Sequence, residues 1–108
     1  MAMELSVRER LLLLDILPAQ GDITTLLVIR EAQEALGFQD EEREALEMVA
    51  EDGRVRWNMQ IETPKIVRLG DAALAIIAGR LKELSERKQL GLEHVDLYRR
   101  FVSQDPST

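Results

Sequence analysis

Residues 9–17, with the sequence E-R-L-L-L-L-D-I-L, constrain the fold more than any other stretch of this chain. In a helix, successive residues lie about 100° apart, so these leucines and the isoleucine spread around most of the helix instead of lining one stripe. A helix that is apolar on nearly every side is usually buried on several sides. We therefore expect this helix at the centre of the fold, with the later amphipathic segments packed around it.

The two ends of this first helix are marked by residues with known capping roles. Ser6 and Glu9 have the spacing of a capping box, in which each side chain accepts a hydrogen bond from the other residue's amide. Pro18 disfavours helical geometry in the residue before it, so the helix should end at Leu17. Four more helices are predicted from capping residues and apolar spacing: 22–37, with Asp22 or Thr24 as cap and a left-handed Gly37 at its end, 40–49, 71–89 and 92–102.

Between the third and fourth of these helices, the apolar period changes to two residues. Val55, Trp57 and Met59 alternate with polar residues, which is typical of a strand with one buried face. A second extended run covers residues 65–69, and we expect the two runs to pair as a hairpin across the irregular segment 60–64. The predicted order is helix, helix, helix, strand, strand, helix, helix, which is a mostly helical α+β fold with one hairpin.

The length and composition predict a single domain. A chain of 108 residues with 45% hydrophobic and 31% charged residues is typical of one globular unit. We expect residues 1–5 to be disordered or left over from cloning, residues 6–102 to form the domain, and residues 103–108 to be a disordered tail. No apolar run approaches the roughly 20 residues that cross a bilayer, and no segment is typical of a signal peptide, so we expect a cytoplasmic protein that does not bind a membrane.

The residues that carry most enzyme chemistry are scarce. The chain has no cysteine and one histidine, which argues against thiolate nucleophiles and against thiolate or imidazole-rich zinc sites. His94 falls among apolar residues of the last predicted helix, where a packed or edge position is expected. The run D-E-E-R-E at 40–44 lacks the spaced oxygen ligands and the glycine of a calcium loop. We therefore expect no enzyme activity, no cofactor and no metal.

Negative charge is concentrated in one segment. Residues 31–52 contain nine acidic residues and one basic residue, a balance of −8, whereas the whole chain has a net charge of −6. The rest of the chain therefore carries +2. A segment of this kind is suited to a partner that presents a basic surface.

The order of elements resembles a winged-helix domain over about residues 6–80. The run D-G-R-V-R-W-N, the loop after it, and K-I-V-R-L-G-D-A-A-L-A-I-I are similar to the wing of MarR-type regulators. That resemblance implies that the third helix would enter the DNA major groove, but this helix is rich in acids, which would face phosphates. The basic residues near the wing are Arg54, Arg56, Lys65 and Arg68. The overall pattern, with E-R-L-L-L-L-D-I-L-P, G-D-I-T-T-L, V-R-W-N and L-Y-R-R-F, also resembles small phage or prophage proteins of no known activity.

Three functional hypotheses follow from these observations. The first is a non-catalytic protein-interaction module that binds a basic partner surface through segment 31–52, with the contacts made by Asp40, Glu41, Glu42, Glu44 and Glu47. The alternative is a dimeric winged-helix transcriptional regulator that contacts DNA through Arg54, Arg56, Lys65 and Arg68. The third is self-association through the last two helices, with Trp57, Tyr98 and Phe101 as anchors.

Overall fold

The first helix, α1 (Val7–Ile16), begins where the sequence predicts. In the computed structural model, which describes residues 2–61 and 64–103, both hydrogen bonds of the capping box are present. The Ser6 amide donates to Glu9 Oε1 at 2.9 Å, and the Glu9 amide donates to Ser6 Oγ at 3.2 Å. Leu17 then adopts an extended conformation before Pro18. Local sequence therefore sets both ends of α1.

The longer helices also lie close to their predicted positions. α2 (Ile23–Leu36) is capped by Asp22, whose Oδ1 accepts a hydrogen bond from the Thr25 amide at 2.8 Å, so Asp22 and not Thr24 is the cap. α4 (Asp71–Glu86) covers most of the predicted fourth helix. The last predicted helix is divided into a 3₁₀ turn, η1 (Leu92–His94), and α5 (Val95–Ser103).

The prediction of a left-handed Gly37 is wrong. Its φ is −70° and its ψ is 175°, which is extended backbone that other residues also adopt. A Cβ at this position would lie 2.9 Å from the carbonyl oxygen of Gln33, closer than real Cβ atoms approach. The glycine is therefore favoured by close approach to the last turn of α2, and not by its φ angle.

The strand pairing differs from the predicted hairpin. α3 (Asp40–Ala45) is shorter than expected, and β2 (Val49–Glu51) follows it. β2 pairs antiparallel with β3 (Arg54–Arg56) across a two-residue turn, Asp52-Gly53. Both turn residues have positive φ, 51° and 74°, as a type I′ turn requires. The expected pairing of strand 55–59 with strand 65–69 is therefore wrong.

β4 (Lys65–Arg68) pairs instead with β1 (Ala2–Leu5) in an antiparallel register that sets Met3 opposite Val67. Residues 2–5 form a strand, so the prediction that they are disordered is wrong. Residue 1 and residues 104–108 of the predicted tail lie outside the described residues, and Ser103 is the last residue of α5.

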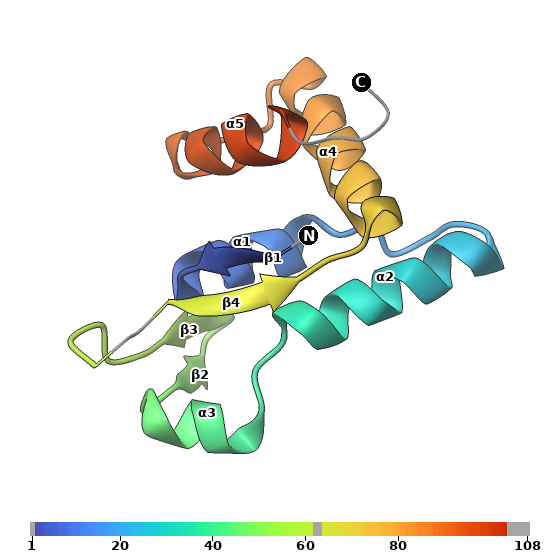
Figure 1. Cartoon of the computed structure of the whole chain (residues 1–108). Helices are drawn as coiled ribbons and strands as arrows, with labels where there is room; N and C mark the ends of the chain where they lie inside the picture. Colours follow the sequence, from blue (N-terminus) through green and yellow to red (C-terminus); the bar gives the residue numbers. More distant parts are fainter. Residues whose placement is uncertain (1, 62–63, 104–108) are drawn as a thin grey trace.

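The fold is α+β, with helices around two small antiparallel sheets, each of two strands. Figure 1 shows α4 and α5 at the top of the molecule, α3 with the β2–β3 hairpin at the bottom, and the β1–β4 sheet between them. One hydrophobic cluster draws on β1, β4 and all the helices except α3. Its fully buried members include Leu5, Leu13, Leu36, Leu74, Ile77, Leu81 and Phe101.

α1 packs against α2 and α4, but it is not enclosed on every side. Leu13 and Ile16 are buried, whereas Leu11, Leu12 and Leu14 are only partly buried. α1 is therefore fully buried on one face only, and not on several sides as predicted. None of the helices in the described residues is long and apolar enough to span a membrane.

Candidate functional site

α3 carries most of the predicted partner-binding residues. Gln39 is its N-cap, and its first turn is acidic, which is favourable next to the positive end of the helix dipole. The exposed carboxylates of this region are Asp40, Glu41, Glu44 and Glu47, which we call the acidic face. Within residues 2–61 and 64–103, none of these four forms an ion pair.

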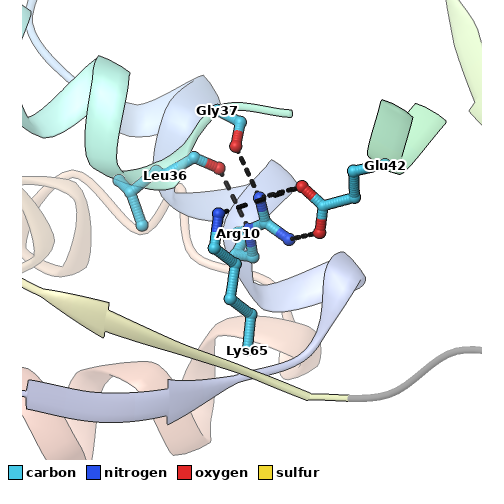
Figure 2. Close-up of polar contacts among 5 residues, drawn as sticks. All are labelled: Arg10, Leu36, Gly37, Glu42 and Lys65. Carbon is cyan, nitrogen blue, oxygen red and sulfur yellow. Dashed lines mark hydrogen bonds and ion pairs between the residues drawn. The ribbon is translucent and has the colours of Figure 1, made fainter. Parts of the chain in front are cut away.

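Glu42 does not belong to this face, because its side chain is bound to Arg10 of α1. Arg10 Nη1 donates to Glu42 Oε2 at 2.6 Å, and Arg10 Nη2 donates to Glu42 Oε1 at 2.9 Å. Figure 2 shows this two-bond pairing of guanidinium and carboxylate. The Glu42 side chain is 26% exposed and its oxygens already serve an internal ion pair, so it is less available to a partner than the sequence prediction implied.

Arg10 also binds the end of α2. Its Nε donates to the carbonyl oxygen of Leu36 at 3.1 Å, and its Nη2 donates to the carbonyl oxygen of Gly37. The guanidinium carbon lies 3.9 Å from the centre of the Phe38 ring, which is a cation–π contact. Arg10 is 1% exposed, and among the described residues it is the one buried charged side chain. A single side chain therefore connects α1, α2 and α3.

The charges around Glu42 favour its ionised form. Hydrogen bonding to Arg10 lowers the pKa of Glu42 below its ordinary value, against the opposite effect of partial burial. Lys65 Nζ lies 4.0 Å from Glu42 Oε1 and adds a weaker attraction. α3 is consequently held to the body of the protein by an ionised pair, and its remaining carboxylates are directed away from the core.

The basic residues proposed for DNA are distributed over two sheets. Arg54 and Arg56 lie on β3, whereas Lys65 and Arg68 lie on β4, and all four are exposed. Arg56 Nη2 pairs with Glu51 Oε2 at 2.6 Å. Since Lys65 also lies next to Glu42, two of these four cations already have acidic neighbours.

An open groove of about 1070 Å³ lies between α1 and the β2–β3 hairpin. Its apolar lining comes from Leu11, Leu12 and Leu14 of α1 and from Val55 and Trp57 of the opposite wall. Its charged lining comes from Arg8, Asp15, Arg54 and Glu93. We call this feature the leucine groove. Sequence reasoning missed it, because it treated every leucine of α1 as part of the core.

The three residues proposed for self-association lie in different environments. Trp57 lines the leucine groove, whereas Tyr98 lines a separate hollow of about 360 Å³ formed by α5 and the end of α4. Phe101 is 0% exposed and belongs to the core, so its assignment as a surface anchor is wrong.

The described residues contain no cluster of three or more histidine, cysteine or acidic side chains that could hold a metal ion. The Nδ1 atom of His94 accepts a hydrogen bond from the Gly91 amide at 3.0 Å, so this histidine closes the η1 turn. That contact agrees with the packed or edge position expected from the sequence.

Arg10 is the important residue that the sequence analysis did not identify. The signal was present, because the residues three and four positions after Arg10 are both leucines, which puts the arginine on an apolar side of the helix.

Comparison with protein-family models, with curated proteins and with solved structures finds no match for this chain.

Proposed function

We propose that this chain is a non-catalytic protein-interaction module that binds a basic surface of a partner protein through the acidic face. The observation that carries the proposal is that the carboxylates of α3 lie in two different environments. Glu42 is directed inward and fastens the helix to Arg10, while Asp40, Glu41 and Glu44 are exposed and without ion pairs in the described part of the chain. A helix fixed in this way presents its carboxylates with little further loss of conformational freedom on binding.

The energetics of such binding are dominated by long-range attraction. Exposed charges contribute little to stability when they have no partner, but they accelerate encounter with a surface of opposite sign. The effect is screened over about 10 Å at 0.1 M salt. The proposed binding should therefore weaken steeply as salt is added.

The test compares two variants that change the net charge equally. Glu41→Lys with Glu44→Lys reverses part of the acidic face, whereas Glu86→Lys with Asp96→Lys reverses exposed acids on α4 and α5. Each immobilised protein is exposed to lysate of the organism that encodes it, at about 50 mM and about 300 mM salt, and bound proteins are identified by mass spectrometry.

We expect wild type and the Glu86/Asp96 variant to capture the same basic protein at low salt, and the Glu41/Glu44 variant to lose it. Equal capture by both variants would show that the acidic face is not the binding surface. Capture that persists unchanged at high salt would also contradict an electrostatic mode of binding.

A second candidate is the winged-helix DNA-binding regulator suggested by the sequence resemblance. One observation favours it: Arg54, Arg56, Lys65 and Arg68 are all exposed. The ion pair between Arg56 and Glu51 and the acidic character of the short α3 weigh against it, since phosphate contacts supply most nucleic-acid affinity.

A gel-shift assay at low salt separates the two candidates. Retention of duplex DNA that is lost on Arg54→Ala and Arg68→Ala would favour the regulator. Absence of any retained DNA at about 50 mM salt would remove it, because even nonspecific binding is strongest under that condition.

A further inference from the structure

The leucine groove is an open surface with both apolar and charged lining. Leu11, Leu12 and Leu14 are partly buried, and the groove they line is also bordered by Val55 of β3, 37% exposed, and by Trp57, which follows β3. Covering such a surface removes apolar area from water, which is favourable at about 25 cal/mol per Å².

An apolar side chain of the same molecule protrudes next to this groove. Leu92 in η1 is 91% exposed, the largest exposed fraction among the big apolar side chains of the described residues. The next residue, Glu93, itself lines the groove. The chain therefore carries a protruding leucine and a leucine-lined hollow in adjacent positions.

The charged lining of the groove has both signs in equal number. Arg8 precedes the leucines of α1 and Asp15 follows them, while Arg54 comes from the hairpin and Glu93 from η1. In a twofold dimer, each residue that contacts a different residue of the partner is matched by the reciprocal contact. With two cations and two acids in the lining, each cation of one copy can face an acid of a second copy, whereas a strongly charged partner would meet repulsion from half of the lining.

We propose that two copies of this chain associate about a twofold axis through the leucine groove. Leu92 of each copy enters the groove of the other and contacts Leu11, Leu12 and Leu14 there. Arg54 of each copy pairs with Glu93 of the partner subunit. This pairing does not use the acidic face, so a dimer would present two copies of that face to a basic partner.

The first measurement is the oligomeric state of the full chain between about 1 µM and about 500 µM, by sedimentation equilibrium. We expect the mass to approach 24.6 kDa, twice the 12.3 kDa of one chain. Trp57 is the only tryptophan and lines the groove, so its emission should shift to longer wavelength as the dimer dissociates on dilution. A mass of one chain at the highest concentration would overturn the proposal.

Four single variants and one double variant identify the surface. Leu92→Arg should raise the dissociation constant about tenfold or more, as expected for a central apolar anchor, whereas Ile66→Arg, at a 66% exposed position on β4, should leave it unchanged. Arg54→Glu and Glu93→Arg should each weaken the dimer, and the two combined should restore it. Circular dichroism checks that every variant is folded. A dimer that tolerates Leu92→Arg, or a double reversal without any recovery, would overturn the proposed contacts.

Discussion

The buried guanidinium of Arg10 provides the sharpest test of what holds this fold together. Arg10→Ala removes the donors that serve Glu42 and the carbonyl oxygens of Leu36 and Gly37, together with the contact to the Phe38 ring. Four acceptor oxygens from two segments lose a donor in one substitution. Water can reach Glu42, whose side chain is 26% exposed, more readily than it can reach the position of Arg10 itself.

The size of the effect follows from burial. Removing one partner of a buried ion pair typically destabilises a protein by about 3–5 kcal/mol, because the other charge remains uncompensated. A lost cation–π contact adds about 0.5–2 kcal/mol, whereas the partial exposure of Glu42 reduces the penalty. We therefore expect the free energy of unfolding to fall by about 3–5 kcal/mol, a large part of the 5–15 kcal/mol typical of a domain.

Urea denaturation followed by circular dichroism measures this loss. Arg87→Ala is the matched control, because Arg87 Nη2 forms a 3.0 Å ion pair with Glu83 while its side chain is 62% exposed. Exposed pairs of this kind contribute about 0.2–1 kcal/mol. Arg10→Lys provides a variant that keeps the charge, and it should lose less than Arg10→Ala, since an ammonium group retains some of the hydrogen bonds.

The reasoning would be refuted if Arg10→Ala and Arg87→Ala cost the same, or if the loss for Arg10→Ala were below about 1 kcal/mol. Either result would mean that solvent replaces the contacts of Arg10 without difficulty.

Two further predictions concern acid stability and the core. Hydrogen bonding to Arg10 lowers the pKa of Glu42, so the stabilisation is fully present above the unfolded pKa and disappears as the pH falls through the lower folded pKa. The difference in unfolding free energy between wild type and Glu42→Gln should therefore narrow on acidification in urea titrations. Parallel curves of stability against pH would contradict this. Asp22, whose pKa is also lowered, is common to both proteins. Phe101→Ala should cost about 3–5 kcal/mol in urea denaturation and clearly more than Tyr98→Ala, and equal losses would argue against Phe101 as a core residue.

The features that could be predicted from the sequence are those determined by neighbouring residues. The capping box joins Ser6 and Glu9, which have only two residues between them, and the structure contains both of its hydrogen bonds. The extent of α4 was predictable from apolar spacing for the same reason. These signals are local, so they do not depend on the rest of the fold.

The strand pairings were not predictable in the same way. β1 pairs with β4 across about sixty residues of sequence, and nothing local in residues 2–5 indicates that partner. The β2–β3 hairpin did have a local signal, the Asp52-Gly53 dipeptide, which favours a type I′ turn. The predicted third helix, 40–49, instead extends to the start of β2, so the prediction leaves no strand before this turn for β3 to pair with.

The candidate site was predictable only in outline. The acidic character of segment 31–52 can be counted directly from the sequence. Binding a partner through this segment requires exposed carboxylates, and Asp40, Glu41, Glu44 and Glu47 are exposed. Which carboxylate turns inward depends on the position of Arg10, thirty-two residues away from Glu42 in the sequence. The leucine groove depends likewise on how the hairpin lies relative to α1, and this is a tertiary relation.

The pairing of β1 with β4 has a consequence for synthesis on the ribosome. Residues 2–5 leave the exit tunnel well before their hydrogen-bonding partners in Lys65–Arg68, which are translated later. During that interval the backbone amides and carbonyls of β1 can bond only to water or to other molecules, and an unpaired strand of this kind can recruit foreign strands. We therefore expect the nascent chain to be most prone to aggregation before Arg68 emerges, and a pulse-proteolysis series on stalled ribosomes would locate that transition.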